Sequence, residues 1–105
     1  MKITQENKTM TVYLTGEIDH HSVKRIRERA DTELTQKRPR TLVLDFSGVS
    51  FMDSSGVGLV MGRYKTAAAL GCRTAVQGLS KRDRSIMELS GLTHLIEFRN
   101  QEENK

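Results

Sequence analysis

The sequence contains no tryptophan, one proline and one cysteine, and only 5% of its 105 residues are aromatic. A single cysteine excludes an internal disulfide bond. No apolar stretch approaches the roughly 18 residues that a membrane-spanning helix requires, and the first residues lack the apolar run of a secretory signal peptide. These absences predict a cytoplasmic protein with no membrane segment.

The aliphatic residues that remain are sufficient for one hydrophobic core. A chain of 105 residues lies at the low end of the single-domain range. With so few large rings, its core must consist mainly of Leu, Ile, Val, Met and Ala. No apolar residue follows Phe98. We therefore expect one domain over residues 1–99 and a polar C-terminal tail over residues 100–105.

The net charge is +4, from 17 basic and 13 acidic residues, which makes an acidic partner or nucleic acid worth considering. The basic residues are dispersed, however. Those of residues 24–33 alternate with acidic residues, and others cluster at 37–40 and 81–84. No aromatic side chains are interleaved with them to stack on bases. The pattern favours a solvated surface and no nucleic-acid partner.

Two periodicities alternate along the first half of the chain. Residues 10–15 alternate apolar and polar side chains, which predicts a strand with one buried face that ends at Gly16. From Ser22 onward apolar residues recur at helical spacing, which predicts an amphipathic helix that ends before Pro39. The apolar run over residues 41–46 then predicts a central strand covered on both faces.

A turn at residues 47–48 is expected to follow that strand, and the absence of proline over residues 55–70 predicts a largely buried helix there. Gly58 and Gly62 lie four residues apart in it, so we expect them to share a close-packed face. Residues 73–77 predict the next strand.

Ser80, followed three residues later by Asp83, indicates the capped start of a third helix. Its expected inward positions are Ile86 and Leu89. Gly91 is the expected C-terminal stop of this helix.

A last short strand is predicted over residues 95–98. Strands that alternate with helices from residue 10 to residue 98 predict an α/β fold with a mixed sheet. The helices should pack mainly on one face, because so short a chain has too few helices to cover two. In such sheets, ligands and modified residues gather at the carboxyl ends of strands. That rule directs attention to the turn before Ser55.

The segment of interest there is Met52-Asp53-Ser54-Ser55-Gly56, between a buried strand and the amino end of a buried helix. Free backbone N–H groups and the helix dipole favour a negative group at such an end, for example a phosphate on serine. The simplest alternative is helix capping, since Asp and Ser are favoured N-cap residues. A serine nucleophile is a third possibility, but the Gly-x-Ser-x-Gly pattern is absent, which argues against a hydrolase.

A second polar cluster, Asp19-His20-His21, lies between the first strand and the first helix. Neighbouring residues seldom point at one ion, and no third or fourth ligand is evident, so we expect no metal site. Asp19 is interpreted as a helix cap and the two histidines as surface residues. Cys72 is interpreted as a small core residue.

Two longer motifs resemble those of the STAS-domain anti-sigma factor antagonists, in particular the sporulation sigma F regulators of Bacillus-type bacteria. They are Leu14-Thr15-Gly16-Glu17-Ile18-Asp19-His20-His21 and Ser50-Phe51-Met52-Asp53-Ser54-Ser55-Gly56-Val57-Gly58. The second continues through residues 62–65, and a weaker match at residues 87–92 extends the resemblance over nearly the whole chain.

The resemblance implies a mixed STAS sheet with helices on one side and a phosphoacceptor at the first serine after the aspartate, Ser54. In the family, the unphosphorylated protein binds an anti-sigma factor that is also an ATP-dependent serine kinase, and so frees a sigma factor. Phosphorylation by that kinase weakens the complex, and a PP2C-type phosphatase reverses it.

On this resemblance we expect a regulatory protein without catalysis or cofactor, monomeric when free. Its expected partner-binding residues are Asp19, Asp53, Ser54, Ser55 and Gly56. Chemistry alone does not separate Ser54 from Ser55. Two departures from the family are the polar C-terminal tail, where family members commonly continue into an amphipathic helix, and the basic charge balance. The alternative hypothesis is a STAS module that senses a nucleotide or another signal without phosphoryl switching.

Overall fold

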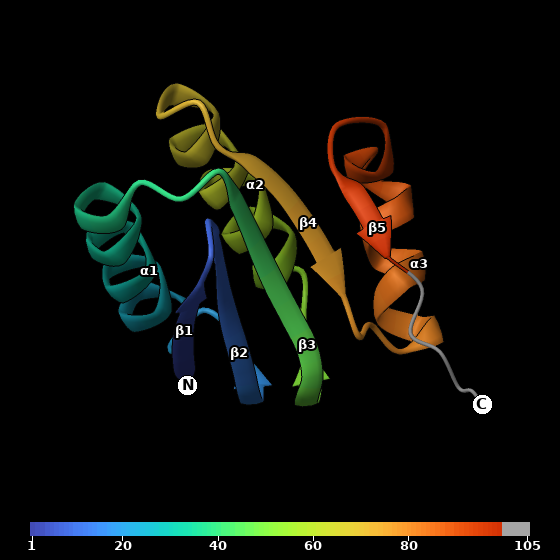
Figure 1. Cartoon of the computed structure of the whole chain (residues 1–105). Coiled ribbons are helices and arrows are strands. Elements are labelled where there is room, and N and C mark those ends of the chain that lie inside the picture. The colour runs from blue at the N-terminus through green and yellow to red at the C-terminus, as the bar shows by residue number, and fades with distance from the viewer. Residues whose placement is uncertain (100–105) are drawn as a thin grey trace.

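The computed structural model describes residues 1–99, and the predicted polar tail, residues 100–105, lies outside the described residues (Figure 1). Within residues 1–99 the chain forms five strands, three α-helices and one short 3-10 helix. In chain order these are β1 (Lys2–Glu6), β2 (Thr9–Ile18), α1 (Val23–Lys37), β3 (Thr41–Met52), α2 (Ser55–Ala69), β4 (Arg73–Gln77), α3 (Lys81–Leu89), η1 (Leu92–His94) and β5 (Glu97–Arg99).

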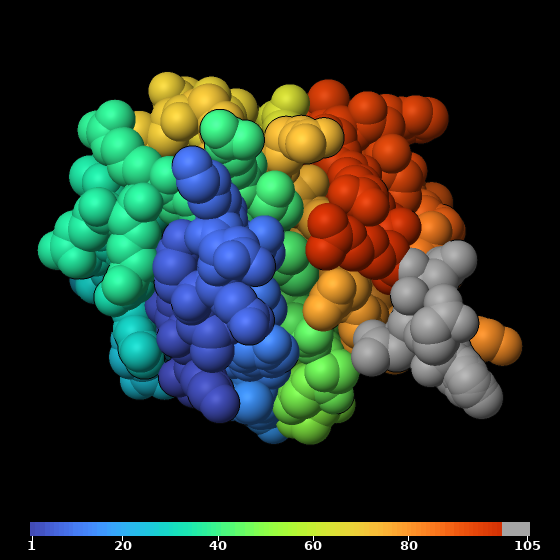
Figure 2. Space-filling model, viewed as in Figure 1, coloured from blue at the N-terminus to red at the C-terminus, as the bar shows by residue number. Residues whose placement is uncertain are grey.

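The five strands form one mixed sheet in the order β1-β2-β3-β4-β5, with β1 antiparallel to β2 and every other pair parallel. Each parallel pair is joined by one α-helix, which η1 follows in the connection from β4 to β5. Because such crossovers are right-handed, a sheet whose strands follow chain order places all its helices on one face. Figure 1 shows the three helices behind the sheet, and Figure 2 shows the opposite face, with β1 (blue) and β5 (red) on either side of β3 (green). The predicted α/β fold is confirmed.

The hydrophobic core lies between the sheet and the helices. Met10, Val12 and Leu14 of β2 are at most 1% exposed and point into it, as their alternation predicts. The central strand β3 is buried on both faces over residues 42–46, which confirms the prediction for that run. Leu34 of α1 joins the same core cluster, together with apolar residues of α2 and α3.

The strands β2 and β3 extend beyond their predicted ends. β2 continues past Gly16 to Ile18, and β3 continues through residues 47–48 to Met52, so the predicted turn there is wrong. Two register shifts in the parallel pairing absorb the irregular residues. Gly48 permits this close approach, because a Cβ atom there would lie 3.0 Å from both the Leu14 carbonyl oxygen and a side-chain carbon of Thr15.

In the helices α2 and α3, some residues predicted to pack on other elements do not do so. Gly58 and Gly62 do not form a close-packed face, because a Cβ atom built at either position meets nothing within 4 Å. In α3 Asp83 and Met87 are buried and Ile86 packs against the core as predicted, while Leu89 is 90% exposed. The prediction is thus right for Ile86 and wrong for Leu89. The predicted start of α3 is confirmed, since the backbone N–H of Asp83 donates to the Ser80 hydroxyl at 3.1 Å.

Candidate functional site

The carboxyl ends of β2 and β3 bring the two polar segments of the sequence together. The parallel register pairs Ile18 with Met52, and the backbone N–H of Asp53 donates to the Ile18 carbonyl oxygen at 3.1 Å. Asp19 and Asp53 directly follow the last residues of β2 and β3. Two acidic residues from distant parts of the sequence therefore meet at one edge of the sheet, beside Ser54.

The amino end of α2 is capped by Asp53. Its Oδ1 atom accepts the backbone N–H of Ser55 at 2.8 Å. Ser54 occupies the N-cap position but makes no side-chain capping hydrogen bond. Ser54 is exposed, whereas Ser55 is half-buried. The capping interpretation is thus right for Asp53 and wrong for Ser54, and exposure separates the two serines where sequence chemistry did not.

Gly56 fixes the path of this loop. It is buried, and a Cβ atom at its position would overlap the Met52 side chain, with the Met52 Cγ atom only 2.6 Å away. The first turn of α2 therefore packs directly on Met52, which is itself fully buried at the end of β3. Of the five residues predicted to bind a partner, Gly56 contributes the shape of the loop and offers no exposed side chain.

Asp19 organises the turn that leads into α1. Its Oδ1 atom accepts the backbone N–H groups of His21 and Ser22, both at 3.0 Å, and its own N–H donates to the Ser22 hydroxyl oxygen at 3.1 Å. The hydrogen bond from Ser22 is the main cause that holds the pKa of the Asp19 carboxyl below its ordinary value. Asp19 is therefore a helix cap as well as a neighbour of Asp53.

The two histidines beside Asp19 are exposed, and their ring centroids lie 4.0 Å apart. Among residues 1–99, no three His, Cys, Asp or Glu side chains converge as a metal site would require. Cys72 is buried, as interpreted from the sequence, and burial raises the pKa of its thiol. No α-helix of the described chain is long and apolar enough to cross a bilayer.

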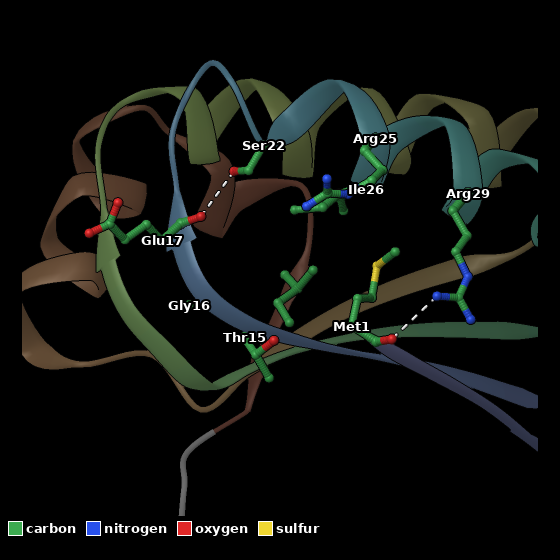
Figure 3. Close-up of a pocket in the computed structure, with 9 residues that line it drawn as sticks. Met1, Thr15, Gly16, Glu17, Ser22, Arg25, Ile26 and Arg29 are labelled. Atoms are coloured by element: carbon green, nitrogen blue, oxygen red, sulfur yellow. Dashed lines mark hydrogen bonds between the residues drawn. The ribbon is translucent and has the colours of Figure 1, made fainter.

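Two hollows flank the site. A groove of about 400 Å³ runs between α1 and α2, and Ser55, Gly58 and Arg27 are among the residues that line it. A cavity of about 370 Å³ lies on the other side of the Asp19 turn, between α1, the second half of β2 and Met1 (Figure 3). There, Arg29 donates to the carbonyl oxygen of Met1 at 3.3 Å, and the Ser22 hydroxyl donates to a backbone carbonyl of β2 at 2.9 Å.

Sequence reasoning missed Arg82, which reaches the site from the start of α3. Its Nη1 atom donates to the Met52 carbonyl oxygen at 3.0 Å, and its guanidinium carbon lies 5.2 Å from the centre of the Phe51 ring. In the sequence, Arg82 was one of the bases clustered at residues 81–84 and was interpreted as part of a solvated surface. The available signal was topological, because α3 begins just after the carboxyl end of β4, at the same edge of the sheet as Ser54.

Comparison with known proteins agrees with this fold. Residues 1–104 match the STAS domain family. The chain is 40% identical, over 90 residues, to the anti-sigma F factor antagonist of Lysinibacillus sphaericus, and the match covers 86% of this chain and 75% of that protein.

Two solved structures are also similar. The anti-sigma factor antagonist SpoIIAA in its unphosphorylated form superposes with a TM-score of 0.83 at 35% identity, over 97% of this chain and 88% of that one. The phosphorylated form of the Bacillus cell fate determinant SpoIIAA superposes with a TM-score of 0.73 at 35% identity, over 97% of this chain and 93% of that one. This chain therefore belongs to the STAS domain family.

Proposed function

We propose that this protein is a cytoplasmic anti-sigma factor antagonist that is switched by phosphorylation of Ser54. In its unphosphorylated form it binds an anti-sigma factor that is also a serine kinase, and a sigma factor is released. Phosphorylation of Ser54 by that kinase ends the binding, and a PP2C-type phosphatase restores it. Support comes from the relatives named as anti-sigma factor antagonists and from the similar phosphorylated structure.

The observation that carries the proposal is the position of the Ser54 hydroxyl. It is exposed at the amino end of α2 and takes no part in capping that helix. A phosphate there is favoured by the helix dipole and by the free N–H groups of the first turn. The phosphate also adds about −1.5 to −2 charges beside Asp53 and Asp19. The electrostatic field at this edge of the sheet therefore changes sharply while the fold is retained.

The same arrangement supports a role in binding without catalysis. Asp53, the nearest carboxylate, already accepts the Ser55 N–H and caps the helix. Asp19 is engaged in the same way in its own turn. Neither carboxylate is therefore positioned as a general base for Ser54. We propose that the free protein is a monomer and acts only through its partners.

The decisive experiment incubates the protein with the cognate anti-sigma kinase and ATP and locates the phosphate by mass spectrometry. We expect one phosphate on Ser54, none on the Ser54→Ala variant, and unchanged labelling of Ser55→Ala. A phosphate on Ser55 contradicts the site assignment.

Binding measurements then test the switch. Ser54→Asp should bind the anti-sigma factor more weakly than the wild type, because it places a negative charge where the phosphate would lie. Ser54→Ala should bind with wild-type affinity and persist in the complex when ATP is present. Equal affinities of Ser54→Asp and the wild type, together with unchanged binding after phosphorylation, contradict phosphoryl switching.

A nucleotide-sensing STAS module is the second candidate, favoured by the cavity in Figure 3. Arg25 and Arg29 of α1 both line it and bring two positive charges to a space of about 370 Å³. Phosphate groups pair well with arginine. Calorimetric titration with GTP and ATP tests this function, because micromolar affinity that is lost in Arg25→Gln supports it. Heat changes no larger than those of dilution exclude it.

A further inference from the structure

Arg82 links the start of α3 to the loop that carries Ser54. Besides its bond to the Met52 carbonyl oxygen, its Nη1 atom lies 3.1 Å from Asp83 Oδ1. Its guanidinium stacks over the ring of Phe51 at a cation–π distance of 5.2 Å. One side chain thus contacts two of the three residues that precede Ser54.

The pair that Arg82 forms with Phe51, hereafter the Phe51–Arg82 surface, is open to solvent. The Arg82 side chain is 58% exposed and Phe51 is 46% exposed. An exposed phenylalanine beside a cation is unusual on a free surface but common at the centre of protein interfaces, where aromatic residues and arginine are enriched. Arg82 is paired with Asp83 through Nη1 alone, so the remaining N–H groups of its exposed guanidinium favour an acidic partner segment.

The Phe51–Arg82 surface lies within electrostatic range of Ser54. The Cα atoms of Met52 and Ser54 are at most about 7.6 Å apart, because each trans peptide spans 3.8 Å. Since Arg82 Nη1 lies 3.0 Å from the Met52 carbonyl oxygen, at most about 12 Å of covalent geometry separates it from the Ser54 hydroxyl, which is comparable to the Debye length of about 10 Å at 0.1 M salt. An arginine–phosphate bond is also stronger than a bond to a neutral carbonyl. A phosphate on Ser54 therefore competes with Met52 for Arg82.

We propose that the Phe51–Arg82 surface binds an acidic segment of the partner, and that a phosphate on Ser54 withdraws Arg82 from that segment. This inference rests on the proposed function. It adds the residue through which the charge of a phosphate on Ser54 affects partner binding. Another cation near the site is Arg27, which lines the α1–α2 groove with Ser55. The experiment must distinguish the two arginines.

A test that needs no partner uses protein in which Ser54 is phosphorylated from the start, by incorporation of phosphoserine during translation. The second pKa of the phosphate is followed by ³¹P NMR. Removal of a positive charge at most about 12 Å away, in Arg82→Gln, should raise that pKa by about 0.25 or more at low ionic strength, and by much more if the two groups touch. The neighbouring acidic residues Asp19, Asp53 and Asp83 are the same in all variants.

The matched control is Arg84→Gln, which removes the same charge from the same helix. Arg84 pairs with Glu88 and stacks over Phe98. The proposal predicts a larger rise in the pKa of the phosphate for Arg82→Gln than for Arg84→Gln or Arg27→Gln. An equal pKa in Arg82→Gln and the wild type, or a larger rise in Arg27→Gln, overturns it.

Binding to the anti-sigma partner then tests the interface. Arg82→Gln should weaken binding of the unphosphorylated protein by about tenfold, and phosphorylation should weaken binding of this variant by a smaller factor than in the wild type. Arg82→Lys, which keeps the charge, should retain most of the phosphate effect.

The possible failures are distinguishable. One outcome is that phosphorylation weakens partner binding of the wild type and of Arg82→Gln by the same factor. In that case Arg82 does not respond to the phosphate and this inference is wrong, while the proposed function stands. If phosphorylation leaves wild-type binding unchanged, the proposed function itself fails.

Discussion

The backbone N–H of Ser55 donates to Asp53 Oδ1 at 2.8 Å, and this bond leaves the hydroxyl of the intervening Ser54 outside the capping contacts of α2. Under the proposed function, structural and regulatory tasks therefore fall on adjacent residues. Asp53 caps the helix, and Ser54 is exposed to solvent. A phosphate can be added or removed here without loss of the cap.

Stability measurements should separate these tasks. Asp53→Ala should lower the free energy of unfolding by about 0.5–2 kcal/mol, the usual cost of a lost N-cap. Ser54→Ala should change it by less than about 0.5 kcal/mol, because Ser54 makes no capping bond. Asp53→Asn retains an oxygen acceptor and is the control. A thermal melt of Ser54→Ala as early as that of Asp53→Ala would show that Ser54 is a cap.

Two glycines of α2 should respond in opposite ways to alanine. Gly56→Ala places a Cβ atom against Met52 and should destabilise the protein by about 1–3 kcal/mol through overpacking. Gly58→Ala meets open space in a helix and should stabilise it by about 0.5–1 kcal/mol. Urea denaturation of both variants measures the difference, and the same sign for both would contradict the packing described here.

The regular elements could largely be predicted from the sequence because their signals are local. The strand over residues 73–77 was predicted with the bounds that β4 has. The helix over residues 55–70 was one residue too long, and the N-cap at Ser80 was correct. Each of these elements has a clear period or an N-cap residue at its start.

The failures involve contacts between distant parts of the chain. β1 was not predicted, because its only inward apolar residue is Ile3 and its pairing depends on β2. The extension of β3 to Met52 depends on bulges in its pairing with β2, which no local pattern encodes. In α3, Ile86 packs against the core as predicted, but the tertiary contacts bury Met87 and leave Leu89 exposed.

The candidate site was predicted to a similar extent. Resemblance singled out Ser54, and topology directed attention to the edge of the sheet where Ser54 lies. The roles assigned to these residues stay predictions until partner binding is measured. Arg82 could not be predicted, since its contact with Met52 spans 30 residues of sequence. The difference in exposure between Ser54 and Ser55 likewise requires the position of α1 beside α2.

The ion pair between α1 and α2 should respond unequally to loss of its two partners. Arg63 Nε lies 2.7 Å from Asp31 Oδ1 and Nη2 lies 3.2 Å from Oδ2, with the Arg63 side chain 5% exposed and that of Asp31 33% exposed. Asp31→Ala leaves a buried cation unpaired and should cost roughly 2–4 kcal/mol. Arg63→Met fills the space and leaves a carboxylate that water reaches, so it should cost less than about 1.5 kcal/mol. Chemical denaturation compares the two, and a larger loss for Arg63→Met would refute this order.

The last prediction concerns Asp45, whose carboxyl is buried on the face of β3 away from the helices. Burial alone raises its pKa, but hydrogen bonds from Ser47 and from Gln77 Nε2, the latter at 2.7 Å, outweigh burial and hold the pKa below the ordinary value of 3.8. A depressed pKa means that the ionised carboxylate stabilises the folded state. This contribution is present above the unfolded pKa and is lost as the pH falls below 3.8 through the folded value.

Gln77→Met removes one donor and keeps a side chain of similar length. It should therefore lower the free energy of unfolding near pH 6, and the difference from wild type should shrink as the pH falls through this window, because protonated Asp45 no longer depends on the donor in the same way. Gln5→Met, on the exposed edge strand β1, is the control and should show no such pH dependence. Urea titrations at intervals between about pH 6 and pH 2.5 measure the effect. A Gln77→Met deficit that is constant across this range would show that Gln77 contributes packing alone and that the charge of Asp45 does not contribute to stability through this bond.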